Sequence, residues 1–274
     1  MSHIRIEDAH DPRLALYAGV REPRLVRARG LLIAEGRFVV RRLLASRRAR
    51  VLSLLVNEAA LRGLGDILGR DDASVEVYVA SPEIIAAATG FNMHRGCLAI
   101  AERPAERSME SVLPTAELVV VLERVVDADN VGSVFRSAEA FGVDVMLLSP
   151  GCCDPLYRKA IRTSSGAALV VPFAAAAPWP AALDHLRAAG FVIAAMTPGD
   201  GAVGVGEFVG TSGARGRTAV LLGTEGQGLT PDALACADVR VRIPMSGALD
   251  SLNIAAAAGI VLHRLHEVRN RVFQ

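Results

Sequence analysis

Apolar and polar positions in the first hundred residues alternate between short apolar runs and stretches with helical spacing. The apolar and helical segments fall at residues 31–34, 38–44, 51–56, 58–68, 75–79, 82–88 and 97–101. This alternation is typical of a small layered α/β structure. A polar segment that contains a proline follows at 102–108, and we place a domain boundary there.

The rest of the chain carries longer, continuous apolar runs, at residues 118–122, 145–148, 192–195, 219–222 and 239–243. Runs that are apolar on both faces suit the strands of a parallel sheet covered by helices. Helical spacing is found at 130–141, 155–163, 179–189 and 252–268. The sequence therefore predicts an α/β protein with a domain at 1–105, a linker at 106–115 and a parallel-sheet domain at 116–274.

The composition agrees with this organisation. A chain of 274 residues with 51% hydrophobic content can form one large core or two smaller ones. The longest apolar candidate, 254–262, is shorter than the roughly 18 residues that a membrane span needs. The first residues have no apolar stretch like that of a signal peptide. We therefore expect a cytoplasmic protein without a membrane segment.

Four cysteines occur, and their spacing is uninformative about metals. Cys97, Cys152, Cys153 and Cys236 show neither CxxC spacing nor nearby histidines. The pattern of a zinc site or of a disulfide framework is missing. We expect buried or incidental thiols, and no metal cofactor.

The formal net charge is only +1, but the charge is unevenly distributed. Residues 1–105 carry 16 arginines against 12 acidic residues, whereas residues 106–274 carry 14 basic against 17 acidic residues. The first part contains a local run of arginines, namely Arg41, Arg42, Arg47, Arg48 and Arg50. Such a run can bind nucleic-acid phosphates or can simply form a solvated helix face, and both interpretations stay open.

Three motifs in the second part carry the chemical information. They read DADNVGSVFR at 127–136, GTEGQGL at 223–229, and IPMSG at 243–247 followed by DSLN at 250–253. The first motif follows a predicted strand and opens a predicted helix. Asn130 therefore lies near the helix N-terminus, where a helix cap is its simplest role, and Arg136 lies about one and a half turns further on.

The second and third motifs are loops that follow predicted strands. The glycines at 223–228 allow backbone amides to approach a ligand closely, and Glu225 is the only charged residue among them. The loop lacks both the Gly-Lys-Ser/Thr of a P-loop and the GxGxxG of a dinucleotide site. In the third motif, Pro244 marks the end of a strand, and Ser251 is a natural N-cap for the helix that follows.

The order and separation of these motifs resemble the SpoU family, also called the TrmH family, of S-adenosylmethionine-dependent RNA ribose 2'-O-methyltransferases. Ala128 stands where the family often has proline, a position that shapes a turn and carries no reacting group. The resemblance is strong over about residues 115–270 and general over 10–105. In that first part, FNMHRG at 91–96 is similar to the segment that closes the substrate-binding domain of larger members.

The resemblance implies a fold and a cofactor site. The second domain would contain the deep trefoil knot of the SPOUT superfamily, and the first would be a small α/β domain like an RNA-binding ribosomal protein. The loops of the knot would hold S-adenosyl-L-methionine in a bent conformation. The implied cofactor-binding residues are Thr197, Leu222, Gly223, Glu225, Gly228, Ile243, Met245, Ser251 and Leu252.

The resemblance also implies a catalytic set, consisting of Arg136, Asn130, Glu225, Ser251 and Asn253. Methyl transfer to a hydroxyl needs alignment of the two substrates, which supplies much of the acceleration, and removal of the hydroxyl proton. A guanidinium has a pKa of roughly 12.5 to 13.8, so lowering it by about five units would cost on the order of 7 kcal/mol. We therefore expect Arg136 to be required as a cation, one that binds phosphate and stabilises developing negative charge.

Partners follow from the same resemblance. We expect a homodimer, with Ile260, Val261, Leu262 and Leu265 of the last helix at the contact. The first domain would bind structured RNA, most plausibly ribosomal RNA, through Arg41, Arg42, Arg47, Arg48 and Arg95. The alternatives are a transfer RNA 2'-O-methyltransferase and a non-catalytic knotted RNA-binding protein. A nucleotide-dependent oxidoreductase ranks lower, because the glycines at 199–206 lack the GxGxxG setting.

Overall fold

The computed structural model describes residues 3–18, 23–68, 75–90, 96–199, 201–247 and 251–270. Two compact units are present. The first comprises Met1–Ala105 together with Pro155–Val170, and the second comprises Glu106–Asp154 together with Val171–Gln274. The division at 105/106 coincides with the expected boundary, whereas the segment Pro155–Val170 belongs to the first unit and not, as expected, to the second.

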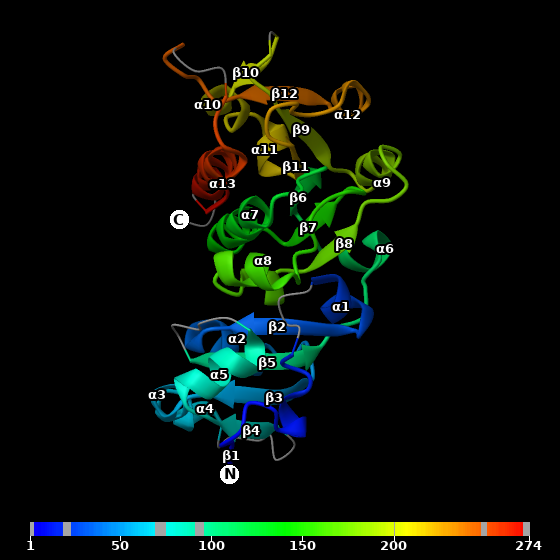
Figure 1. Ribbon diagram of the computed structural model, residues 1–274. Helices are drawn as coiled ribbons and strands as arrows, with labels where there is room; N and C mark the ends of the chain where they lie inside the picture. Colours follow the sequence, from blue (N-terminus) through cyan, green and yellow to red (C-terminus); the bar gives the residue numbers. More distant parts are fainter. Residues whose placement is uncertain are drawn as a thin grey trace. The chain divides into compact units, whose positions relative to one another are not determined.

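The first unit is built on a five-stranded mixed sheet with the order β1-β4-β3-β5-β2. Strands β1, β4 and β3 are parallel, and β5 is antiparallel to both β3 and β2 (Figure 1). Its elements are β1 (Ile4–Arg5), η1 (Pro12–Leu14), α1 (Pro23–Ala28), β2 (Leu31–Glu35), α2 (Arg37–Ser46), β3 (Val51–Val56), α3 (Glu58–Arg62), α4 (Gly65–Leu68), β4 (Glu76–Val79), α5 (Pro82–Thr89), β5 (Cys97–Glu102), α8 (Arg158–Thr163) and η2 (Ala167–Leu169).

The segment Pro155–Val170 is held to the first unit by polar contacts of arginine. Arg158 Nη1 lies 2.6 Å from Oε2 of Glu35, the last residue of β2, and Glu35 is almost completely buried. Arg42 on α2 donates to the carbonyl oxygen of Ser165 at 3.1 Å, and Arg48 donates to that of Val170. Because these partners lie more than 100 positions apart in the sequence, the local pattern of apolar and polar residues cannot predict that they pair.

The second unit contains a seven-stranded sheet with the order β10-β12-β9-β11-β6-β7-β8, in which every described pair is parallel. The predicted parallel sheet is thereby confirmed. The elements of the unit are α6 (Met109–Val112), β6 (Leu118–Glu123), α7 (Ala128–Ala140), β7 (Val145–Leu148), β8 (Phe173–Ala175), α9 (Ala182–Ala188), β9 (Val192–Met196), β10 (Val203–Gly204), α10 (Val205–Phe208), α11 (Ser212–Arg215), β11 (Thr218–Gly223), α12 (Pro231–Ala235), β12 (Val239–Arg242) and α13 (Ile254–Asn270).

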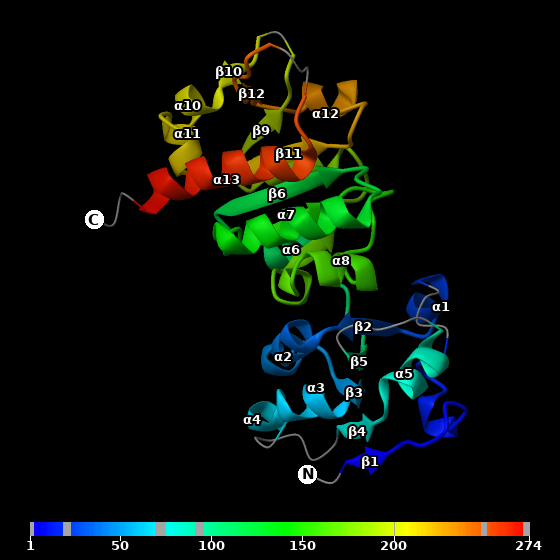
Figure 2. The ribbon, with the colours of Figure 1, turned by 60° about the vertical axis from the view of Figure 1, so that its left-hand side comes forward.

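The long helix α13 packs alongside α7 over the sheet (Figure 2). Val261, Leu262 and Leu265 of α13 are fully buried within this chain, and only Ile260 among the four residues expected at a dimer contact is exposed. The buried three therefore stabilise the second unit itself. A dimer contact on this helix would have to use its outward face.

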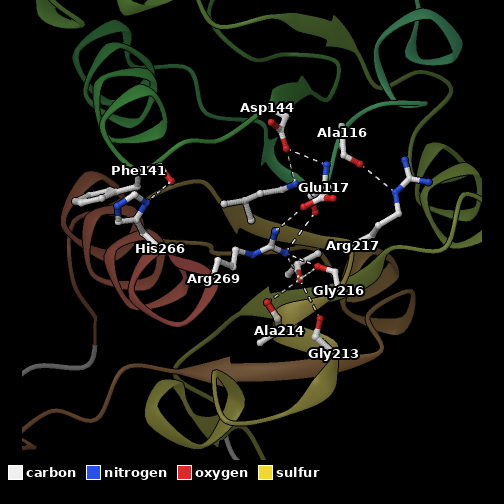
Figure 3. Close-up of polar contacts among 12 residues, drawn as sticks. Ala116, Glu117, Phe141, Asp144, Gly213, Ala214, Gly216, Arg217, His266 and Arg269 are labelled. Atoms are coloured by element: carbon white, nitrogen blue, oxygen red, sulfur yellow. Dashed lines mark hydrogen bonds and ion pairs between the residues drawn. The ribbon is translucent and has the colours of Figure 1, made fainter. Parts of the chain in front are cut away.

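The residues expected to form a linker instead belong to the core of the second unit. Met109, Val112 and Leu113 are buried in the same cluster as strands β6, β7, β9 and β11. Arg217 fixes this segment, since its guanidinium donates to the carbonyl oxygen of Leu113 at 2.5 Å and to that of Ala116 at 3.0 Å. Figure 3 shows the contact with Ala116. Near residue 105 the chain therefore passes from the first unit to the second without a separate linker, and it passes between the units again at 154/155 and 170/171.

Side-chain hydrogen bonds also stabilise the end of this sheet at which its strands begin (Figure 3). Asp144 Oδ2 accepts from the backbone N–H groups of Glu117 and Leu118 at 2.8 and 2.9 Å, where β6 begins. Arg269, near the end of α13, donates to Thr218 Oγ1 at 3.1 Å and to the carbonyl oxygen of Gly216. Burial lowers the pKa of the Arg269 guanidinium. These contacts hold the edge opposite to the carboxyl ends of the strands.

Two findings bear on the other expectations from composition. All four cysteines are free, Cys97 is buried, and burial raises the pKa of its thiol to about 12. Among the residues described, none of the helices combines the length and the apolar character that crossing a membrane requires.

Candidate functional site

A pocket of about 510 Å³ opens at the carboxyl ends of β9, β11 and β12 in the second unit. In a parallel sheet these ends meet at one edge, which is where open α/β sheets usually bind ligands. Three loops form the walls, one after each strand, together with the first turn of α13. The lining residues are Met196, Thr197, Pro198, Gly199, Leu222, Gly223, Thr224, Glu225, Gly226, Gln227, Gly228, Leu229, Leu234, Val241, Ile243, Met245, Ser251, Leu252, Asn253, Ile254 and Ala257.

All nine residues expected to bind the cofactor lie in this lining. The structure therefore brings together loops that are separated by tens of residues in the sequence. Met245 and Leu252 are each 37% exposed although they are apolar, and both line the pocket. Apolar side chains that remain exposed in a concave site are typical of a ligand-binding surface. Residues 248–250, between the third strand and Ser251, lie outside the described part of the chain.

The glycine-rich loop folds back closely on itself. A Cβ atom on Gly223 would lie 2.3 Å from the carbonyl carbon of Gly228 and 2.4 Å from the backbone nitrogen of Leu229. Gly226 and Gly228 have φ values of 80° and 67°, a region that residues with a Cβ atom rarely adopt. The loop can therefore close over the end of β11 only with glycine at these positions.

Asn253 contacts two other expected catalytic residues. Its Nδ2 donates to Oδ1 of Asn130 at 3.0 Å and to Oε1 of Glu225 at 2.5 Å. Its Oδ1 accepts from the backbone N–H groups of Ala255 at 2.8 Å and Ala256 at 3.4 Å. One side chain thus caps α13 and joins the start of α7 to the glycine-rich loop.

This arrangement corrects two expectations about helix caps. Ser251 was expected to cap the last helix, but that helix begins at Ile254 and Asn253 supplies the capping oxygen. Ser251 instead lines the pocket. Asn130 is likewise not a cap, because Asp127 accepts from the N–H groups of Asp129 and Asn130 at the start of α7. The side chains of Asn130 and Ser251 are therefore available for other roles.

Arg136 lies apart from this group. It is exposed on α7, and no hydrogen bond or ion pair joins it to another residue in the part of the chain described. Six residues of helix separate it from Asn130, which corresponds to about 9 Å along the axis and to a different face. Within one chain, the structure does not bring Arg136 into the lining of the pocket.

Glu123, the last residue of β6, contacts the residue that follows the glycine-rich loop, and it was missed from the sequence. It is 1% exposed, and it accepts from Trp179 Nε1 at 2.7 Å, from Thr230 Oγ1 at 2.6 Å and from the Thr230 backbone N–H at 2.9 Å. Thr230 follows the glycine-rich loop and caps α12. The signal available in the sequence was a single carboxylate at the end of an otherwise apolar strand.

Most of the arginines expected to bind RNA contact other residues of the chain. Arg41 pairs with Asp66 at 2.5 Å, and Arg42 and Arg48 hold the segment Pro155–Val170 as described above. Arg47 is exposed at the C-terminus of α2, with a φ of 50°. Arg95 lies outside the described residues. Their binding to RNA stays a prediction.

No group of three or more metal-ligating side chains comes together among the described residues.

We expect Asn253→Asp to separate folding from function. The aspartate keeps an oxygen for the N–H groups of Ala255 and Ala256, so the free energy of unfolding should change by less than about 1 kcal/mol. It removes the N–H donor and places a negative charge against Glu225, so methyl transfer should fall by about tenfold to a hundredfold. Thermal unfolding and a methyl-transfer assay measure the two effects.

The matched variant is Asn253→Ser, which keeps a capping oxygen and removes the donor without adding charge. We expect an intermediate loss of activity. Equal activity of both variants and the parent would show that the contacts with Asn130 and Glu225 are dispensable.

Glu123→Gln should destabilise the wall of the pocket. Glutamine offers one acceptor oxygen, so either Trp179 or the backbone N–H of Thr230 would face an N–H₂ group. One unsatisfied buried donor lowers the free energy of unfolding by about 1 to 3 kcal/mol. Chemical denaturation measures this change, and calorimetry should show weaker binding of S-adenosylmethionine, the cofactor that the sequence predicts.

An exposed carboxylate of the same unit, Glu207, provides the control. Glu207→Gln should leave both stability and ligand binding unchanged. A Glu123→Gln protein as stable as the parent would contradict the role given to the buried contacts.

Comparison with known proteins identifies the family of this chain. The sequence profile of the SpoU rRNA Methylase family matches residues 117–263, more than half of the chain and most of the second unit. An uncharacterized tRNA/rRNA methyltransferase of Mycobacterium tuberculosis is 44% identical over 260 residues, which cover 93% of this chain and 89% of the relative. The chain belongs to the SpoU family. The predicted family is thereby confirmed, and the pocket lies within the matched region.

More distant SpoU relatives and solved structures extend the comparison. The 23S rRNA (guanosine(2553)-2'-O)-methyltransferase RlmP of Bacillus subtilis is 27% identical, over 71% of this chain and 74% of that protein. An RNA 2'-O ribose methyltransferase structure has a TM-score of 0.80 and 25% identity, over 97% of this chain and all of that one. An AdoMet-bound rRNA methyltransferase from Sinorhizobium meliloti has a TM-score of 0.81 at 22% identity, over 96% and 97% of the chains. At that identity, the likeness shows a shared fold.

Proposed function

We propose that this SpoU protein transfers a methyl group from S-adenosyl-L-methionine to the ribose 2'-OH of a nucleotide in ribosomal RNA. The observation that carries the proposal is the pocket of the second unit, where Asn253 joins Asn130 and Glu225 beside a glycine-rich wall. Relatives named as 2'-O-methyltransferases of 23S rRNA support the reaction and the class of substrate.

The pocket suits the proposed cofactor in size and chemistry. Its volume of about 510 Å³ lies in the range of small-molecule sites. Leu222, Leu234 and Val241 offer apolar contacts to a purine ring, and the loop at 223–228 offers backbone amides and carbonyls. Structures of relatives with AdoMet bound support the assignment. The bound sulfonium supplies an activated methyl group.

The residues of the chain position the ribose that accepts the methyl group, and they stabilise the negative charge that develops on its oxygen. Asn253 holds the carboxylate of Glu225 at the mouth of the pocket, and Asn130 and Ser251 can hydrogen-bond a ribose placed there. Alignment of the hydroxyl with the methyl group lowers the barrier by positioning alone. The guanidinium of Arg136 binds the adjacent phosphate and stabilises the negative charge that develops on the ribose oxygen. The bond from oxygen to the methyl carbon would form as the bond from that carbon to sulfur breaks, with release of S-adenosylhomocysteine and transfer of the hydroxyl proton to solvent water.

The position of Arg136 favours a homodimer as the active unit. Arg136 is absent from the lining of its own pocket, and no hydrogen bond or ion pair joins it to a residue in the described part of the chain. In a dimer, the arginine of one chain can reach the pocket of the other. Ile260, which is 38% exposed on α13, is available for such a contact.

The remaining expectations belong to the same proposal. The second unit carries the deep trefoil knot, the first unit binds structured RNA, and the enzyme works in the cytoplasm. The location of β11 between β9 and β6, with α13 returning to pack on α7, supports a threaded arrangement of the last elements.

The test is transfer of labelled methyl from S-adenosylmethionine to total ribosomal RNA and transfer RNA of a strain that lacks the protein, followed by nucleoside mass spectrometry. We expect one 2'-O-methylnucleoside in ribosomal RNA. Methylation of transfer RNA alone would select the alternative substrate. Binding of the cofactor without any transfer would favour a non-catalytic RNA-binding protein.

A further inference from the structure

Phe38 is a large aromatic residue that lies on the exposed face of its helix. It is the second residue of α2, whose inner face consists of the buried residues Val39, Val40 and Leu43. The side chain of Phe38 is 61% exposed. In the first unit, the only other large hydrophobic residue exposed among those described is Leu16, at 39%. The core does not use this aromatic ring, and the described residues of the first unit form no patch of exposed large hydrophobic side chains around it. Such a ring is unlike a protein-docking surface.

The surroundings of Phe38 are cationic. Helix α2 carries Arg37, Arg41 and Arg42 and no acidic residue. The guanidinium carbon of Arg42 lies 5.9 Å from the centroid of the Phe38 ring, within the range of a cation–π contact. Arg37 is exposed next to Phe38 in the sequence. A flat aromatic face among arginines matches RNA, which offers stacking bases joined by phosphates.

The position of Arg42 is fixed by the turn at the end of α8. Arg42 Nη1 donates to the carbonyl oxygen of Ser165 at 3.1 Å, and Ser165 and Gly166 have φ values of 52° and 82°. A Cβ atom on Gly166 would lie 3.4 Å from Arg42 Cδ, a tight contact. The turn thus leaves room for the arginine and holds its guanidinium beside the ring.

We propose that Phe38 and Arg42 form a stacking site for an unpaired base of the RNA substrate. This inference rests on the proposed function, because it assumes that the chain acts on RNA. It assigns the first unit a preference for single-stranded loops or bulges, since bases within a helix cannot reach an aromatic side chain. Arg42 would contribute through the plane of its guanidinium, and phosphates would contact neighbouring arginines such as Arg37.

The test measures binding of two labelled RNA hairpins to the full chain. The first hairpin has a loop of unpaired adenosines, and the second has the same stem and phosphates with abasic sites in the loop. Stacking contributes about 1 to 3 kcal/mol per base, so Phe38→Ala should weaken binding of the adenosine hairpin by about 5-fold to 150-fold. Binding of the abasic hairpin should not change.

Three further variants separate stacking from other effects. Phe38→Trp keeps an aromatic face and should retain the preference for the adenosine loop, whereas Phe38→Leu keeps only the apolar character and should lose it. Leu16→Ala removes the other large hydrophobic side chain that is exposed among the described residues of the unit, and it should have no effect. The slope of log affinity against log salt should stay the same in Phe38→Ala, because no charge is removed.

The outcomes distinguish this inference from the proposed function. If the parent methylates RNA but Phe38→Ala binds both hairpins as the parent does, the stacking site is overturned and the function stands. Equal losses with both hairpins would also overturn it, because the effect would then not involve the bases. If the parent neither binds nor methylates RNA, the proposed function fails and the inference fails with it.

Discussion

Replacement of Arg136 by alanine should lower methyl transfer by about 100-fold to 1,000-fold, the usual effect of removing one group that stabilises developing charge. The affinity for S-adenosylmethionine should not change, because Arg136 is absent from the lining of its own pocket. The free energy of unfolding should also stay the same, since the side chain is exposed and engages no described residue. Steady-state kinetics and calorimetry measure the two quantities.

Arg215→Ala removes an exposed arginine of the same unit and is the matched control. Arg136→Lys keeps the charge but not the planar fork of donors, and it should recover only part of the activity. Mixed dimers of Arg136→Ala and Asn253→Asp chains should regain activity if each chain completes the site of the other. An Arg136→Ala enzyme as active as the parent would remove Arg136 from the mechanism.

Gly223→Ala should strongly weaken binding of the cofactor. The added Cβ would lie 2.3 Å from the carbonyl carbon of Gly228, a contact that only a movement of backbone can relieve. Overpacking of this kind costs about 1 to 3 kcal/mol and occasionally more, so the affinity for S-adenosylmethionine should fall by about 5-fold to 150-fold or beyond. Calorimetry measures the affinity, and thermal unfolding shows whether the loss is confined to the loop.

Two other glycines calibrate this effect. Gly228→Ala meets no atom within 4 Å but must adopt a φ of 67°, which costs about 1 to 2 kcal/mol. Gly206→Ala, in helix α10, would meet its nearest atom at 4.0 Å and should be harmless. Unchanged binding in Gly223→Ala would mean that the close approach of the two ends of the loop is not needed for the site.

Much of the second unit could be predicted from the sequence because its elements are locally encoded. The continuous apolar run at 118–122 becomes β6 (Leu118–Glu123), and the run at 145–148 becomes β7. Strands buried on both faces leave this mark whatever their neighbours are. Strand β8 (Phe173–Ala175) and strand β10 (Val203–Gly204) were missed, since pieces of two or three residues are too short to show a period.

The site shows the same division between local and distant information. The motifs located the loops of the pocket, because glycine, proline and asparagine have backbone and capping preferences that act within a few residues. The capping residue itself was chosen wrongly, as Ser251 and Asn253 are both good caps and only the observed helix start decides between them. Glu123 was missed because the three hydrogen bonds that its carboxylate accepts come from Trp179 and Thr230, far along the chain.

The sequence by itself determined the two-part organisation, the parallel sheet and the residues around the pocket, because each depends on spacing, turn chemistry or a family motif. Only the tertiary structure decided that Pro155–Val170 joins the first unit. It alone also decided that Arg136 is absent from the lining of the pocket. Those outcomes depend on ion pairs and packing between residues more than a hundred positions apart, such as Arg158 with Glu35. Local periodicity carries no information about which distant segments meet, and the free energy of packing alone selects them.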